Sequence, residues 1–167
     1  IPRGITPLQG FELSGDRRTL VIGSPTTGVD GGGQVYVFTR NSPQATQWRR
    51  VGAIIQRPDD LDFFSRSFGF KTTVNYDGTV VAVSAPDAEG RAGAVYVFEL
   101  RRQGQRRFWA QRGPRILGTN RLPRNVPTSL GGSLALSRDG SVVAAGSDIR
   151  NDAAVFRYSM DRFGNYS

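Results

Sequence analysis

The sequence lacks cysteine and histidine altogether, and it has a single lysine, Lys71. Without cysteine and histidine, the chain can form no disulfide bond, no zinc site of the usual kind, no Ser-His-Asp triad and no cysteine nucleophile. No apolar run approaches the roughly 18 to 20 residues that a membrane-spanning helix needs. The sequence therefore predicts no transmembrane segment, and it excludes most of the familiar enzyme classes.

Glutamate is also scarce, which limits catalysis by paired carboxylates of the kind that glycosidases use. The three glutamates are Glu12, Glu89 and Glu99, and nothing in their positions pairs any two of them. Lys71 is interpreted as a surface residue of a strand. Segment 28–33 is rich in glycine, but it lacks the following Lys-Ser or Lys-Thr step of a nucleotide-binding loop. We therefore expect a chain that is not an enzyme and has no cofactor.

Positive charge is abundant and unevenly placed. The chain has 22 basic and 14 acidic residues, a net charge of +8, and residues 100–138 contain nine arginines and no acidic residue. Arginines on edge strands can simply prevent pairing between molecules. If they bind a partner, an acidic protein surface or an anionic polysaccharide suits them, whereas no nucleic-acid-binding motif accompanies the charge. The candidate binding residues are Arg101, Arg102, Arg106, Arg107, Arg112, Arg115, Arg121 and Arg124.

An internal repeat organises the chain. Its three copies each begin with a short strand, an Asp-containing turn and a second strand, and the shared turn positions are Asp16, Asp77 and Asp139. The second strand is apolar nearly throughout, which is typical of a strand covered on both faces. The copies cover approximately residues 7–63, 64–125 and 126–167, the last one truncated, within one module of residues 1–167.

The repeat continues after the second strand. A third strand of alternating β-branched and aromatic residues is predicted in all three copies, at a constant interval of 60 residues. A fourth strand follows in the first two copies, where Trp48 and Trp109 each precede a glycine by four residues. The third-strand segments are GQVYVFTR (33–40), GAVYVFEL (93–100) and AAVFRYSM (153–160).

The second copy carries a recognisable set of landmarks: Phe68-Gly69 at its start, Ser84-Ala85-Pro86 after the second strand, and then GAVYVF and Trp109. This set resembles the FG-GAP repeat, the blade of β-propellers such as the integrin α-subunit head. The resemblance implies an all-β fold of three four-stranded antiparallel blade-like repeats, in a partial or oligomer-completed β-propeller. It also implies a non-catalytic protein-interaction or scaffold module that is extracellular, at the cell surface or in an organelle lumen.

Many integrin-type blades hold calcium in a loop with several Asp or Asn residues, because this cation takes six to eight oxygen ligands. Here each corresponding turn has one carboxylate, so we interpret Asp16, Asp77 and Asp139 as residues of plain hairpin turns. The one acidic cluster, Asp59-Asp60-Asp62, follows a proline and is interpreted as a surface loop. We expect no metal site.

Three copies are too few for an ordinary ring, because propellers close with about four to eight blades. We therefore expect a piece of a longer array, or a chain docked in an assembly. Its partners would be another protein, or further blades of the same or another chain. Two alternatives remain open: an accessory structural subunit that docks through its arginine-rich face, and a binder of anionic polysaccharide.

Overall fold

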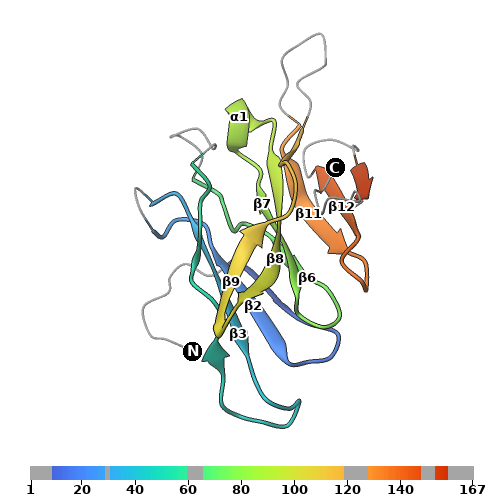
Figure 1. The fold of residues 1–167 in the computed structure, drawn as a ribbon. Helices are drawn as coiled ribbons and strands as arrows, with labels where there is room; N and C mark the ends of the chain where they lie inside the picture. Colours follow the sequence, from blue (N-terminus) through green and yellow to red (C-terminus); the bar gives the residue numbers. More distant parts are fainter. Residues whose placement is uncertain (1–8, 29–30, 60–65, 119–127, 148–152, 158–167) are drawn as a thin grey trace.

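The chain folds into three antiparallel sheets that follow one another in sequence order (Figure 1). The computed structural model describes residues 9–28, 31–59, 66–118, 128–147 and 153–157. These ranges contain thirteen strands and one short helix, α1 (Ala88–Arg91), whose central residues Glu89 and Gly90 have left-handed backbone angles. The predicted all-β fold class is confirmed, and none of the three sheets closes on itself.

The first sheet contains β1 (Gly10–Leu13), β2 (Thr19–Ser24), β3 (Gln34–Thr39), β4 (Arg49–Arg50) and β5 (Ile55–Gln56). The strands lie in the order β1-β2-β3-β4, and β5 also pairs with β3. The predicted fourth strand is therefore present as two short pieces. Gly52 lies between these pieces with a φ of +72°, a left-handed angle that glycine adopts readily. The glycine that follows Trp48 thus marks the place where the strand is interrupted.

The second sheet repeats this arrangement with β6 (Thr72–Val74), β7 (Val80–Ala85), β8 (Ala94–Gln103), β9 (Arg106–Gln111) and β10 (Ile116–Leu117). The order is β6-β7-β8-β10, and β9 also pairs with β8. Gly113, with a φ of +69°, separates β9 from β10. All six residues of β7 are buried, which confirms for the second copy the prediction that the apolar second strand is covered on both faces. In the third copy only Val143 and Ala145 of the second strand, residues 142–147, are buried, so the prediction is wrong there.

The third sheet contains β11 (Leu130–Leu136), β12 (Val142–Ser147) and β13 (Ala153–Arg157), in that order. Its register corrects the sequence alignment. Val143 of β12 pairs with Phe156, whereas Val81 at the equivalent position of β7 pairs with Phe98. Phe156 therefore takes the place of Phe98, so the constant interval of 60 residues is wrong for the third copy. The interval changes because the connection from β12 to β13 is shorter than the connection from β7 to β8, which contains α1.

The three Asp-containing turns have the same hydrogen bonds. The carboxylates of Asp16, Asp77 and Asp139 each accept a bond from the backbone N–H two residues later, at 2.9, 3.2 and 3.0 Å. Two residues before each Asp, a side-chain oxygen accepts a bond from a backbone N–H near the start of the second strand. These bonds are Thr19 N to Ser14 Oγ, Val80 N to Asn75 Oδ1 and Val142 N to Ser137 Oγ, each 2.9 Å long.

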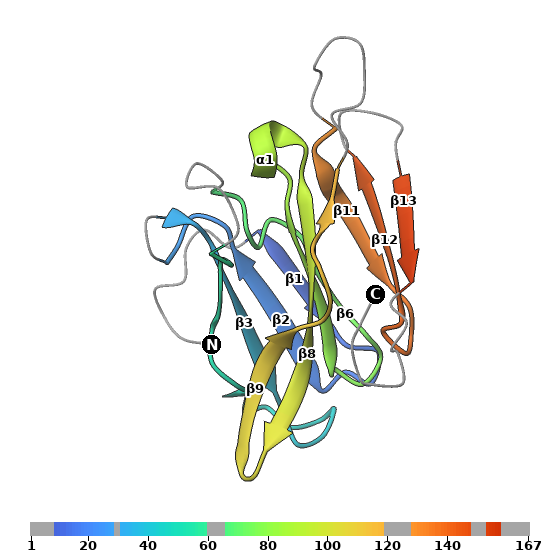
Figure 2. The same cartoon turned by 45° about the horizontal axis from the view of Figure 1, so that its top comes forward.

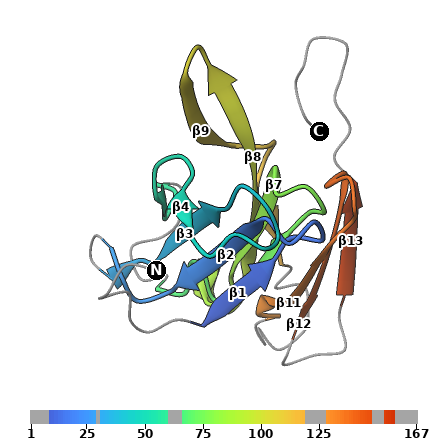
Figure 3. The same cartoon turned by 90° about the horizontal axis from the view of Figure 1, so that it is seen from below.

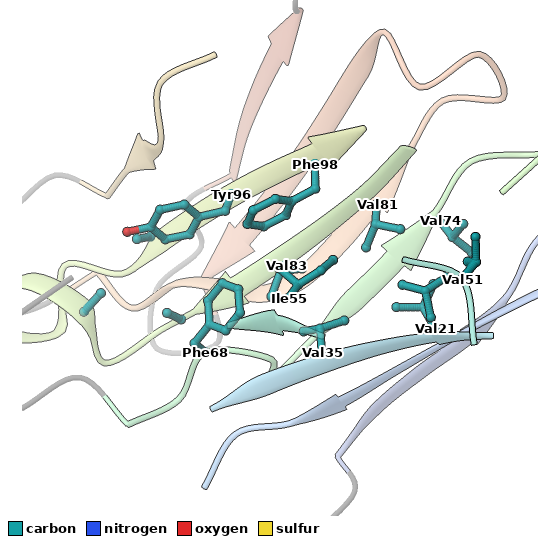
Figure 4. Close-up of a cluster of buried hydrophobic side chains, with 14 residues drawn as sticks. Val21, Val35, Val51, Ile55, Phe68, Val74, Val81, Val83, Tyr96 and Phe98 are labelled. Atoms are coloured by element: carbon teal, nitrogen blue, oxygen red, sulfur yellow. The ribbon is translucent and has the colours of Figure 1, made fainter. Parts of the chain in front are cut away.

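The larger hydrophobic cluster lies between the first and second sheets (Figure 4). Val21 of β2 and Val81 of β7 belong to it, and both are fully buried. Phe68, the first residue of the predicted Phe-Gly landmark, is also fully buried. Its ring meets that of Tyr96 edge to face, with centroids 5.8 Å apart, and that of Phe98 at 6.2 Å. The landmark phenylalanine thus packs against β8 within the cluster that lies between the two sheets.

A second cluster lies between the second and third sheets, where Val80, Ala82 and Val97 meet Leu130 and Val143. These side chains of the second sheet alternate along their strands with those of the first cluster, because successive residues of a strand point to opposite faces. The second sheet is therefore sandwiched between the other two (Figure 2). The three sheets thus form a row, and their first strands are in contact: β1 contacts β6, and β6 contacts β11.

Candidate partner-binding surface

The hairpin of β8 and β9 extends beyond the rest of the second sheet (Figure 3). Pairing between β7 and β8 ends at Glu99, whereas pairing between β8 and β9 continues to Gln103 opposite Arg106. Gly104 in the turn has a φ of +58°. Four of the eight predicted binding residues lie on this projecting ribbon and are exposed, and we call them the hairpin arginines: Arg101, Arg102, Arg106 and Arg107.

Two of the hairpin arginines are placed in a way that does not favour the stability of the hairpin. Arg102 lies directly opposite Arg107, and like charges in such a pair are destabilising. The Arg102 Nε donates a hydrogen bond to the carbonyl oxygen of Gly104 at 2.8 Å, which holds the side chain over the turn. Arg101 forms an ion pair with Glu99. An acidic partner would relieve the repulsion between Arg102 and Arg107.

Two of the remaining predicted arginines, Arg112 and Arg115, form contacts within the fold. The side chain of Arg112 is only 11% exposed, and its Nη1 donates a hydrogen bond to the carbonyl oxygen of Gly140 in the third sheet at 2.7 Å. Arg115 forms an ion pair of 2.9 Å with Glu89. These two arginines hold parts of the fold together. Arg121 and Arg124 lie outside the described residues.

No protein-family model and no curated protein matches this chain. Within the part that the structure describes, no helix is long and apolar enough to cross a membrane. The chemistry of this surface is therefore interpreted from its own charges and contacts.

Arginines from other parts of the chain gather beside the hairpin, and the sequence analysis missed them. A cleft of about 300 Å³ between the first two sheets is lined by Arg18 and Arg107, together with Asp16 and Asp77. A second hollow is lined by Arg107 with Arg49. The sequence signal was a run of arginines along the chain, whereas these residues meet only because two sheets pack together.

Several carboxylates of the described residues take part in local contacts. Glu89 and Glu99 form ion pairs with arginines. Partial burial raises the pKa of Glu12, and a hydrogen bond with Thr73 opposes this rise. Hydrogen bonds from Ser137 and Ser141 lower the pKa of Asp139 to about 2.

The described ranges contain no group of three acidic residues that could hold a metal ion. Of the predicted acidic surface loop, Asp59 is exposed, and Asp60 and Asp62 lie outside those ranges. Lys71, interpreted from the sequence as a surface lysine, is exposed.

The two landmark tryptophans have different surroundings although they occupy equivalent positions in the repeat. Trp109 packs against the cluster between the first two sheets, and its Nε1 donates a hydrogen bond to the carbonyl oxygen of Val51 at 3.0 Å. Trp48 instead has the guanidinium of Arg40 over its ring, 4.7 Å from the centroid. Trp109 therefore joins two sheets, whereas Trp48 holds an arginine in place.

Proposed function

We propose that the chain is part of a β-propeller of the FG-GAP type, in which residues 7–63, 64–125 and 126–167 are three blade-like repeats. In this proposal it is a non-catalytic interaction module, and the hairpin arginines bind an acidic surface of a partner protein. A module of this kind fits a location outside the cell, at its surface or in an organelle lumen.

Contacts that recur from one sheet to the next support the blade interpretation. Gly33 and Gly93, with φ of +98° and +87°, each come just before the third strand of their copy. A Cβ at Gly33 would lie 2.0 Å from the carbonyl oxygen of Phe68, and one at Gly93 would lie 2.2 Å from the backbone N of Leu130. The Phe-Gly landmark of the second copy corresponds to Leu130-Gly131 in the third copy. The absence of a Cβ at Gly33 and Gly93 thus lets the landmark of the next copy approach closely.

The Asp-containing turns also join successive copies. The backbone N–H of Asp16 donates to the carbonyl oxygen of Tyr76 at 2.9 Å, and the N–H of Tyr76 donates to that of Arg138 at 3.1 Å. The Arg138 guanidinium lies over the Tyr76 ring, 3.6 Å from its centroid. Each of these turns therefore contacts the equivalent turn of the next copy. Blades arranged around a common axis would have such contacts between equivalent turns.

Both ends of the row of sheets present apolar side chains that further blades would cover. Phe11 of β1 is 69% exposed and Val155 of β13 is 70% exposed. Soluble proteins rarely leave an apolar blade face uncovered, because repeats are stabilised by their neighbours. Further blades of the same or another chain are the partners that suit these two ends.

The observation that carries the binding proposal is the pair of opposed arginines on a ribbon that projects away from the sheets. Arg102 and Arg107 weaken the hairpin by their repulsion, and the fold does not need them for its core. Negative potential on a partner would attract this surface and speed association, and salt would weaken the attraction. The same charges would also attract an anionic polysaccharide.

The test is retention of the protein on immobilised poly-L-glutamate, measured as the salt concentration needed for elution. We expect the double variant Arg106→Glu/Arg107→Glu to lose retention, with an unchanged β-sheet spectrum. The matched control is Arg91→Glu/Arg157→Glu, which makes the same change in net charge at two exposed arginines outside the hairpin. Its retention should fall only slightly.

Equal losses in the two double variants would show that net charge alone causes retention, and would contradict the proposed site. A parallel column of heparin separates the two classes of partner. Stronger retention on heparin than on poly-L-glutamate, lost in the hairpin variant, would favour the anionic polysaccharide over the acidic protein.

A further inference from the structure

A hollow of about 370 Å³ lies beside the hairpin, between the end of β3, the loop that leads to β4, and β9. Three arginines line it: Arg40 after β3, Arg49 in β4 and Arg107 in β9. Thr46 and Gln47 on the same wall add neutral hydrogen-bonding groups, whereas the Thr39 hydroxyl already donates to the carbonyl oxygen of Arg18 at 3.1 Å. No carboxylate lines this hollow, in contrast to the neighbouring cleft, which contains Asp16 and Asp77.

Arg40 is fixed before any ligand arrives. Its Nε donates a hydrogen bond to the carbonyl oxygen of Arg17 at 2.9 Å, and its Nη1 donates one to the carbonyl oxygen of Ala45 at 3.1 Å. The indole ring of Trp48 packs against its guanidinium. A guanidinium has five N–H donors, so these bonds leave others for a ligand. A side chain that is already ordered loses less conformational entropy on binding than a mobile one.

Arg49 and Arg107 complete the positive wall from two different sheets. Both side chains are exposed, and in the described part of the chain neither forms an ion pair with a carboxylate. The carboxylate of Glu99 forms an ion pair with Arg101 and lies 3.9 Å from the Arg112 Nε. Arg107 also lines the neighbouring cleft, which contains Asp16 and Asp77. Three positive charges therefore face one small polar volume with no negative charge on its wall.

We propose that this hollow binds a single tetrahedral oxyanion group, a sulfate or phosphate ester carried by a ligand. Guanidinium groups match such oxyanions by pairs of parallel N–H···O bonds, which gives geometric selectivity as well as charge. Three arginines from three separate segments suit a group with three terminal oxygens better than a flat carboxylate with two. The hydroxyl and amide groups beside them can hold the remainder of the ligand. This site does not depend on the docking of a protein to the hairpin.

The test is a titration of the protein with inorganic sulfate and with inorganic phosphate, followed by backbone amide NMR shifts at constant ionic strength. The expected shifts are at Thr39, Thr46 and Gln47. Titration with chloride corrects for general screening. Arg49→Gln removes one charged hydrogen-bonding partner, so the affinity should fall about tenfold or more. Arg157→Gln is the matched control, because Arg157 is an exposed arginine that belongs neither to the hairpin nor to the lining of the hollow, and its affinity should stay within about twofold of the parent.

Shifts with sulfate or phosphate that do not exceed those with chloride would overturn the proposal, and so would an Arg49→Gln variant that binds like the parent. N-acetylglucosamine 6-sulfate and phosphoserine then distinguish the two carriers. The carrier that binds more tightly than its inorganic anion identifies the ester. Binding of the inorganic anions without binding of either ester would overturn the assignment to an ester. Arg107 belongs to both surfaces, whereas Arg49 is not a hairpin arginine. The comparison of Arg49→Gln with the parent therefore tests the hollow separately from retention on poly-L-glutamate.

Discussion

At the scale of single residues, the three Asp-containing turns differ most at one position. Gly78 and Gly140 have φ of +76° and +72°, and at the equivalent place in the first copy Arg17 has a φ of +61°. A side chain with a Cβ is strained in this left-handed region. Arg17 is exposed, and it contributes through its backbone, whose carbonyl oxygen accepts the hydrogen bond from Arg40. The first turn therefore stores strain that the other two avoid.

Arg17→Gly should stabilise the protein, because it removes the strain and keeps the backbone hydrogen bonds. We expect a gain of about 1 kcal/mol in the free energy of unfolding. Urea unfolding measures it as a higher midpoint with an unchanged slope. The control is Gly104→Ala in the β8–β9 turn, where the φ is +58° and a Cβ would meet nothing within 4 Å, so it adds strain alone. A loss of stability in Arg17→Gly would contradict this account of the turn.

Asp139 makes stability depend on pH in the acid range. Hydrogen bonds from Ser137 and Ser141 lower its pKa from 3.8 to about 2 in the folded protein. The unfolded chain therefore binds more protons between these values, so the stabilisation is present above pH 3.8 and is lost as the pH falls through 2. Asp139→Asn should flatten the fall in stability over this interval. Urea unfolding at several pH values measures it, and equal slopes for the parent and the variant would contradict the assignment.

At the scale of secondary-structure elements, the strands could be read from the sequence and their interruptions could not. Alternation and apolar runs predict the first three strands of each copy, because half-buried and fully buried strands have these patterns. The break in the fourth strand lies at Gly52 and Gly113, which have positive φ values. Glycine permits such an angle but does not require it, so its presence in the sequence does not predict the break. The register of β13 is likewise set by its pairing with β12. A comparison of sequence segments at a constant interval holds no information about this pairing.

The same limit applies to the arginines of the candidate site. Their density along the chain predicted a basic surface, and the structure places four of them on one exposed ribbon. Sequence could not separate these four from Arg112 and Arg115, because the partners of those two arginines come from other elements, namely Gly140 and Glu89. Nor could it find Arg49, which approaches Arg107 only across the boundary between two sheets.

At the scale of the whole molecule, stability should be distributed along the row of sheets. The first and third sheets each contribute to one hydrophobic cluster, whereas the second contributes to both. In such an arrangement each unit depends on its nearest neighbours, as in repeat proteins. The loss of an end sheet removes one interface, and the loss of the middle sheet removes two.

Val81 and Val143 test this dependence, because they occupy equivalent places in β7 and β12 and are both fully buried. Truncation to alanine in either place should cost about 1–3 kcal/mol. Hydrogen exchange should show that Val143→Ala reduces protection in the third sheet and leaves β2 and β3 protected. Val81→Ala should reduce protection in all three sheets, because the third sheet packs mainly on the second, through β11, among the described residues. An equal loss everywhere in both variants would mean that the three sheets unfold as one cooperative unit.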